Sequence, residues 1–152
     1  MNLNHITIVE EANEALKEYT GGQLYLNGLT SAKGLILPEL VSGYLDLSSL
    51  KSTEGLTLPK SVSGYLDLGS LKSAKGLTLP ESINRGLDLS SLKSAKGLVL
   101  PKKVNGGLYL GGLKSAKGLT LPESVGGDIN LGGLRSAEKE TLRKDYPLLR
   151  II

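Results

Sequence analysis

The sequence predicts an all-β protein, a parallel β-solenoid built from 21-residue coils with a short helical cap at each end. A leucine-x-leucine motif and a later proline both recur every 21 residues, which is the signature of a stacked repeat. The chain also contains no Phe, Trp or Cys, so its core must be filled by Leu, Val, Ile and Ala. The 152 residues fit one domain. We divide it into an N-terminal cap (1–21), solenoid repeats (22–134) and a C-terminal cap (135–152).

The repeat reads L-x-L-x-x-L-K-S-A-K-G-L-T-L-P-x-x-V-x-G-x, and five full copies run from residue 24 to residue 128. A sixth copy begins at Ile129 and decays. Twenty-one residues cannot bury their own leucines, but stacked coils bury them in one continuous column. Adjacent coils are expected about 4.8 Å apart, so equivalent residues form rows along the axis. The leucine rows expected inside begin at Leu24, Leu26, Leu29 and Leu35.

Two strands are predicted in each repeat. Residues 44–48 alternate between apolar and surface-tolerant side chains, as a strand with one buried face requires. Residues 56–58 alternate in the same way and are bounded by Gly55 and Pro59, so we predict the second strand there. Gly34 and its equivalents are expected to hold a positive φ at a corner. The serine row that begins at Ser31 is expected to donate to turn carbonyls.

Helical caps are predicted at both ends, because a solenoid otherwise exposes open strand edges. Residues 8–19 have an amphipathic pattern and are predicted to form a helix. Thr7 and Glu10 are predicted to form a capping box at its start, and Gly21 is predicted to end it. At the other end Ser136 is expected to cap a helix that runs to about Asp145. The apolar residues 148–152 then fold back over the last coil, or they contact a second copy or add a strand to a partner.

Composition and motifs argue against catalysis. The single histidine, His5, precedes the first helix, and no zinc-site spacing, phosphate-binding loop or calcium-binding loop is present. The absence of Cys removes disulfides and thiolate metal sites. We therefore expect no enzyme, no cofactor and no metal. No secretory signal or membrane span is recognisable, so we expect a cytoplasmic protein that does not enter membranes.

The first candidate site is a face of tyrosines and aspartates on the first strand. Tyrosine is enriched at binding surfaces because it combines apolar area with a polar tip. The aspartates follow one row, and the tyrosines either share that row or lie two residues earlier. We predict that this face binds a protein partner through Tyr25, Tyr44, Asp46, Tyr65, Asp67, Asp88 and Tyr109.

The second candidate is a lysine corner, which is the alternative function. One row contains Lys51, Lys72, Lys93, Lys114 and Arg135. A second row, three residues away and interrupted by Glu54, contains Lys33, Lys75, Lys96 and Lys117. Phosphate or carboxylate groups on a partner would relieve the repulsion within these rows, so nucleic acid or another polyanion is the expected ligand. The competing interpretation is a solvated face that keeps the repeat soluble.

Two further rows are interpreted as structural. One alternates in charge from coil to coil and favours correct register: Glu39, Lys60, Glu81, Lys102 and Glu123. The other consists of β-branched residues: Ile36, Thr57, Thr78, Val99 and Thr120. A flat threonine array would suggest ice binding, but two aliphatic residues interrupt it and no second threonine row lies beside it.

The L-x-L-x-x-L core followed by L-P-x-x-V resembles bacterial leucine-rich repeats over residues 22–134. The stretch from Leu77 to Ile83 is similar to part of the BspA-like surface repeats, and the short period resembles leucine-rich solenoids of bacteria and their phages. Leu50 stands where such motifs end in asparagine, which favours a straighter solenoid than a horseshoe. The resemblance leaves a right-handed β-solenoid and a leucine-rich-repeat type both open, and it concerns architecture, not function. We predict a protein-binding module, an inhibitor or adaptor of bacterial or phage origin.

Overall fold

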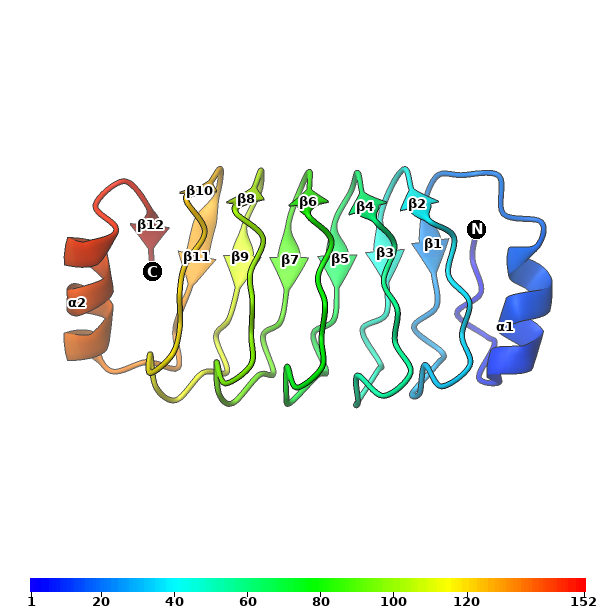
Figure 1. Cartoon of the computed structure of the whole chain (residues 1–152), viewed down its shortest axis with the longest axis horizontal. Coiled ribbons are helices and arrows are strands. Elements are labelled where there is room, and N and C mark those ends of the chain that lie inside the picture. Colours follow the sequence, from blue (N-terminus) through cyan, green and yellow to red (C-terminus); the bar gives the residue numbers. More distant parts are fainter.

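The computed structural model describes all residues 1–152 and shows a straight parallel β-solenoid with one helix at each end (Figure 1). One face of the solenoid is a seven-stranded parallel sheet in the order β1-β3-β5-β7-β9-β11-β12. Its strands are β1 (Leu24–Tyr25), β3 (Leu45–Asp46), β5 (Leu66–Asp67), β7 (Leu87–Asp88), β9 (Leu108–Tyr109), β11 (Asp128–Asn130) and β12 (Arg150–Ile151).

The opposite face is a five-stranded sheet in which every pairing is again parallel. Its strands are β2 (Leu40–Val41), β4 (Ser61–Val62), β6 (Ser82–Ile83), β8 (Lys103–Val104) and β10 (Ser124–Val125). In both sheets the coils pair residues that are 21 positions apart, for example Leu45 with Leu66 and Val62 with Ile83. We number the coils 1 to 5, starting at residues 24, 45, 66, 87 and 108.

The core lies between the two sheets and is a column of leucines closed by valine, isoleucine and alanine. The rows that begin at Leu24, Leu26 and Leu29 are buried in every coil, as predicted. The row that begins at Leu35 is buried in coils 1 and 3 and only partly buried in coils 2, 4 and 5. Burying one leucine side chain contributes roughly 1.5–3 kcal/mol, so these rows are the main source of stability.

The second strand lies later in the repeat than predicted. Leu56 and Leu58 are half-buried, but residues 56–58 belong to neither sheet. The hydrogen-bonded strand is β4, on the far side of Pro59. Alternation of burial fixes which side chains face inward, but it does not show which backbone amides meet a neighbouring coil. Proline has no N–H to give to such a ladder, and pairing begins after it.

The corners follow the repeat. Gly34, Gly55, Gly76, Gly97 and Gly118 hold φ values between 73° and 82°, as predicted for the left-handed region. The serine row has the opposite role to the one predicted. The Ser73 hydroxyl accepts the Lys75 N–H at 3.2 Å instead of donating to a carbonyl, and Ser31, Ser52, Ser94 and Ser115 do the same in their coils.

The N-terminal cap is the helix α1 (Val9–Leu16), with Ala12 and Leu16 buried against coil 1. The predicted capping box is wrong, because Ile8 occupies the N-cap and no side chain caps the helix. Before the helix, Asn2 forms an isolated parallel bridge with Tyr25 of β1. The Leu3 N–H donates to the Tyr25 carbonyl at 2.9 Å, which closes this end of the larger sheet.

The C-terminal cap is the helix α2 (Ser136–Asp145), followed by Tyr146 and Pro147. Ser136 is the first helical residue and Arg135 is the N-cap, so the prediction that Ser136 caps the helix is wrong. The chain then folds back, and β12 pairs in parallel with β11, as one of the two alternatives for residues 148–152 predicted. The Arg143 guanidinium donates to the Ile151 carbonyl at 3.0 and 3.2 Å, which covers the outer edge of that strand.

Neither helix has the length and apolar character that a bilayer span requires.

The corner glycines offer a direct test of the fold. A Cβ added at Gly76 meets no atom within 4 Å, so only its φ of 75° opposes a side chain there. Gly76→Ala is expected to lower the free energy of unfolding by about 1–2 kcal/mol, and Gly76→Asn by less, because asparagine tolerates the left-handed region. Urea unfolding measures both. Equal stability of the alanine variant and the wild type would contradict the corner assignment.

Candidate functional site

The tyrosines of the first predicted site form one continuous row on the larger sheet. Neighbouring ring centroids are 5.5 Å apart for Tyr25 and Tyr44, 5.6 Å for Tyr44 and Tyr65, and 6.1 Å for Tyr65 and Tyr109. All three pairs are tilted, which is a favourable geometry for aromatic rings. The structure therefore brings together four tyrosines that are spread over 85 residues of the sequence.

The aspartates of this face accept hydrogen bonds from other groups of the protein. The Tyr44 hydroxyl donates to Asp67 Oδ2 at 3.0 Å, and the Tyr65 hydroxyl lies 3.5 Å from Asp88 Oδ2. The other oxygen of each carboxylate accepts a backbone N–H two residues later, for Asp67 that of Gly69 at 2.9 Å. Asp46 makes the same turn contact and is only 7% exposed. Most carboxylate oxygens of this face therefore already have a partner within the protein, and Asp46 is the one aspartate that is buried. Its contact with a protein partner stays a prediction.

Burial also changes the acid–base properties of this face. It raises the pKa of the Tyr44 and Tyr65 phenols, and the neighbouring carboxylates raise it further. Burial likewise raises the pKa of the Asp67 carboxyl, against the opposing effect of the Gly69 N–H and the Tyr44 hydroxyl. The phenols of Tyr44 and Tyr65 therefore stay protonated at neutral pH, and the Tyr44 hydroxyl remains a donor to Asp67.

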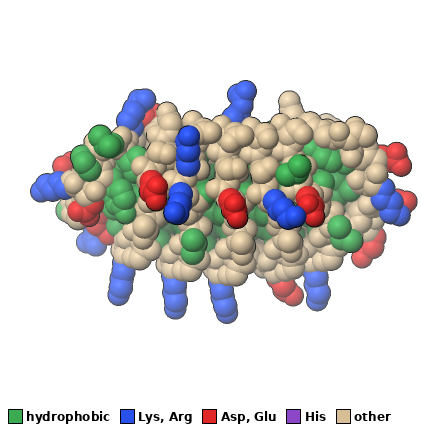
Figure 2. All heavy atoms as spheres, turned by 45° about the horizontal axis from the view of Figure 1, so that its top comes forward, with side chains coloured by type: hydrophobic (Ala, Val, Ile, Leu, Met, Phe, Trp, Pro, Cys, Tyr) green, Lys and Arg blue, Asp and Glu red, His purple; other side chains and the backbone are tan.

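The lysine corner is fully exposed. In the row of Lys51, Lys72, Lys93, Lys114 and Arg135, long backbone hydrogen bonds of 3.4 Å join Lys93 to Lys72 and Lys114 to Lys93. Beside it lies the second row, in which Lys33 pairs with Glu54 at 3.8 Å. Figure 2 shows a row of basic side chains along one long edge, broken by one acidic side chain. We call the two rows together, including Glu54, the lysine edge.

The lysine edge dominates the charge of the molecule. It contains nine basic residues and one acidic residue, a net charge of +8, whereas the whole chain carries +3. The rest of the molecule therefore carries −5. A shallow groove of about 500 Å³ at the same corners is lined by polar side chains that include Lys51, Ser73 and Lys75, and also by the acidic Glu54. This arrangement can hold several anionic groups in a line.

His5 is exposed in the turn before α1, and the corner serines accept hydrogen bonds from their own turns. No group of three or more His, Cys, Asp or Glu side chains is arranged to hold a metal ion.

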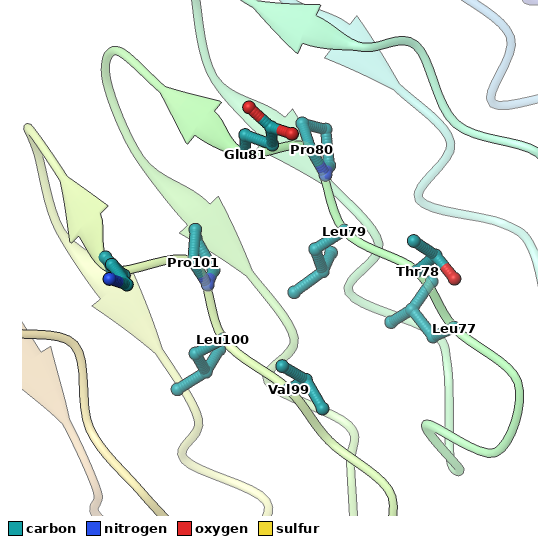
Figure 3. Close-up of a pocket in the computed structure, with 9 residues that line it drawn as sticks. Leu77, Thr78, Leu79, Pro80, Glu81, Val99, Leu100 and Pro101 are labelled. Atoms are coloured by element: carbon teal, nitrogen blue, oxygen red, sulfur yellow. The ribbon is translucent and has the colours of Figure 1, made fainter.

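Sequence reasoning missed a third surface, on the proline side of the repeat. Neighbouring coils leave a groove of about 640 Å³ between residues 77–81 and residues 99–102. Figure 3 shows the two extended segments side by side, with Leu79 directed from one toward the other. Smaller grooves of about 460 and 360 Å³ lie at the equivalent places between coils 2 and 3 and between coils 4 and 5. The signal in the sequence was the recurring proline, which interrupts ladder pairing at this point.

The alternating charge row crosses these grooves, and Figure 2 shows it as acidic and basic side chains in turn. Lys60 pairs with Glu39 at 3.0 Å and Lys102 with Glu123 at 3.9 Å, as the interpretation of this row as structural implies. Glu81 has no cation within 4.0 Å, so no ion pair spans the groove on either side of it.

No protein-family model matches the chain, and no curated protein or solved structure matches it either. The solenoid of 21-residue coils is thus shown by the structure alone, and the function rests on the surfaces described above.

The raised pKa of Asp67 has a consequence for stability. A carboxyl whose pKa is higher in the folded state than in the unfolded state binds a proton more readily when folded, so it favours folding as the pH falls. The free energy of unfolding of the wild type, relative to that of Asp67→Asn, is expected to increase as the pH is lowered from 7 to 4. Tyr44→Phe is expected to enlarge this trend, because the Tyr44 hydroxyl lowers the pKa. Urea titrations across this range measure it, and a difference that is independent of pH would contradict the assignment.

Proposed function

We propose that this chain is a non-catalytic binding module and that its lysine edge binds a linear polyanion. The observation that carries the proposal is the charge separation, with +8 on one exposed edge against −5 elsewhere. Like charges about 4.8 Å apart repel each other, and this repulsion costs stability unless a ligand neutralises them. Neutralising a row of phosphates releases their condensed counterions, which favours association.

The chemistry of the edge favours recognition of the anionic groups and not of bases. Lysine and arginine contribute point charges and hydrogen-bond donors, and no aromatic side chain lies within the two rows. Aromatic platforms are what single-stranded nucleic acid binding uses to stack bases. The proposed contact is therefore independent of the base sequence, and it extends over coils 1 to 5 and Arg135 at the start of α2.

We also propose that the chain is a short leucine-rich-repeat protein of the bacterial or phage type and acts in the cytoplasm. Parallel coils of constant length with buried leucine rows support the repeat type. The straight solenoid fits the replacement of the usual asparagine by Leu50 and its equivalents (Figure 1). The family proposal concerns the architecture alone, and it does not identify a binding partner.

A second candidate function is protein binding, as an inhibitor or adaptor, through the tyrosine row. The observation that favours it is the continuity of the four rings across coils 1 to 5, with Tyr109 37% exposed. Rigid aromatic side chains lose little conformational freedom on binding, and they are common anchors of interfaces. The aspartates support these rings and are not themselves the contact groups in this version of the hypothesis.

One set of variants tests both candidates. The edge variant Lys72→Glu with Lys93→Glu is expected to bind heparin and a 30-base-pair DNA duplex at least about tenfold more weakly at 0.1 M salt. Its slope of log affinity against log salt is expected to be smaller by about 2, because two ionic contacts are lost. The matched control, Lys103→Glu with Lys144→Glu, changes the net charge equally at exposed positions away from the edge.

Equal weakening of the edge variant and the control would contradict the lysine edge. Weak binding of both polyanions by the wild type at low salt would contradict the proposal as a whole. A third variant, Tyr65→Ser with Asp67→Asn, leaves the edge intact. If proteins captured from a host lysate bind the wild type and both charge variants but not this third variant, the tyrosine row is the functional surface. Capture that is unaltered in all variants contradicts that second candidate.

A further inference from the structure

A polar pocket lies at the turns that lead from the smaller sheet to the larger one, along the upper edge of the solenoid in Figure 1. Its volume is about 380 Å³. The turns after β2 and β4 (residues 42–44 and 63–65) line it, with Gln23 before them and Arg85 after them along the stack. No residue of the lysine edge or of the alternating charge row lines this pocket.

Arg85 departs from the repeat at this pocket. The equivalent position is glycine in the neighbouring coils: Gly43, Gly64 and Gly106. The Arg85 N–H donates to the Gly64 carbonyl at 3.2 Å, which holds the Arg85 backbone beside the second turn. Its guanidinium forms no ion pair and no hydrogen bond within the protein. Arg85 is therefore a free cation, and it is the only charged residue that lines the pocket.

Backbone N–H groups without partners are the second feature of the pocket. Those of Gly43, Tyr44, Gly64 and Tyr65 make no hydrogen bond within the protein, and all four residues line the pocket. The bond that would correspond to that of Arg85, from the Gly64 N–H to the Gly43 carbonyl, is absent. Such donors need water or a ligand atom, because an unpaired amide costs about as much as a lost hydrogen bond.

The tyrosine row forms one wall of the pocket. The rings of Tyr44 and Tyr65 are 5.6 Å apart, and the Tyr44 hydroxyl is bound to Asp67. A Cβ added at Gly86 would lie 2.5 Å from the Tyr65 ring, so glycine at this position makes room for the ring beside Arg85. Asp67 and Asp88 do not line the pocket, so no carboxylate opposes an anion inside it.

We propose that this pocket binds the phosphate group of a small phosphate monoester. The Arg85 guanidinium contacts two phosphate oxygens at once, because its N–H groups form a planar fork that matches them. The N–H groups of Gly43 and Gly64 and the exposed hydroxyls of Ser42 and Ser63 supply further donors. A phosphate presents three strong acceptor oxygens to such a set of donors.

The rest of the ester fits the same pocket. Its volume of about 380 Å³ lies within the range of small-molecule sites. Beyond the phosphate, the Gln23 side chain and the tyrosine rings supply polar and apolar contacts for a sugar-sized group. This site is separate from the lysine edge, so it does not depend on polyanion binding.

An NMR titration of the ¹⁵N-labelled full chain with ribose 5-phosphate tests the pocket, at a constant ionic strength of about 0.15 M so that screening does not change. The Gly43 and Gly64 amide resonances are expected to shift in a saturable way. Inorganic phosphate is expected to bind more weakly and ribose not at all. The same shifts are expected in the edge variant Lys72→Glu with Lys93→Glu, which separates this site from the lysine edge.

The repeat supplies the matched variants. Arg85→Gly introduces the glycine of the neighbouring coils, and it is expected to weaken ribose 5-phosphate binding at least about tenfold, because a charge-assisted contact is lost. Arg85→Gln keeps a long side chain and is expected to weaken binding equally. Lys103→Ser is the control, because it also removes one positive charge and introduces the residue found at Ser61 and Ser82, outside the pocket. It is expected to bind as the wild type does.

Three results would overturn the proposal. The first is the absence of saturable shifts at Gly43 and Gly64 in the wild type. The second is equal weakening by the arginine variants and by Lys103→Ser, which would show a response to net charge alone. The third is inorganic phosphate that binds as tightly as ribose 5-phosphate, which would exclude the ester. Arg85→Gln decides the role of the guanidinium even if Arg85→Gly loosens the turn.

Discussion

Parallel backbone hydrogen bonds between coils of constant length are the interaction on which the rest of this structure depends. The Leu45 N–H donates to the Tyr65 carbonyl at 2.8 Å, and one coil later the Leu66 N–H donates to the Gly86 carbonyl at 2.9 Å. A shift of one residue in this register would turn every leucine of a strand outward. The constant coil length therefore decides at the same time which side chains form the core and which form the surface rows.

The register also decides which charged side chains lie next to each other on the surface, and so whether a row stabilises or destabilises the fold. The lysine edge places like charges on successive coils, whereas the row that contains Lys60 and Glu39 places opposite charges there. The proline of each repeat interrupts the ladder between the two sheets and leaves grooves with unpaired amides. The helical caps contribute polar groups at both ends: Arg143 donates to the Ile151 carbonyl on the outer edge of β12, and the Asn13 side-chain oxygen accepts the Ile36 N–H of coil 1.

The sequence repeat predicted most of the fold, because the leucine pattern gives both the length of each coil and the side chains that are buried. The sequence pattern predicted the second strand at residues 56–58, because apolar and polar side chains alternate there. This alternation indicates burial but not backbone hydrogen bonding. The strand β4 after Pro59 has only two residues, which is too short to show a recognisable alternation. The same limit applies to the site. The sequence pattern showed the aspartate row that contains Asp46. The burial of Asp46 could not be predicted from it, because this burial depends on how strand β3 and the turn at Ser48 fold around the side chain. The contact of Asn13 occurs once, so no repetition signals it.

Disulfide trapping across neighbouring coils measures the register most directly, since the chain contains no cysteine of its own. Ser61 and Ser82 pair between β4 and β6, which places their Cα atoms at about the 4.8 Å strand spacing, within the range that a disulfide accepts. Ser61→Cys with Ser82→Cys is predicted to oxidise readily to an intrachain disulfide in the native protein. Ser61→Cys with Asn84→Cys, two residues out of register and roughly 8 Å apart, is predicted to stay reduced. Rapid oxidation of the second pair and not of the first would contradict the stacked-coil account.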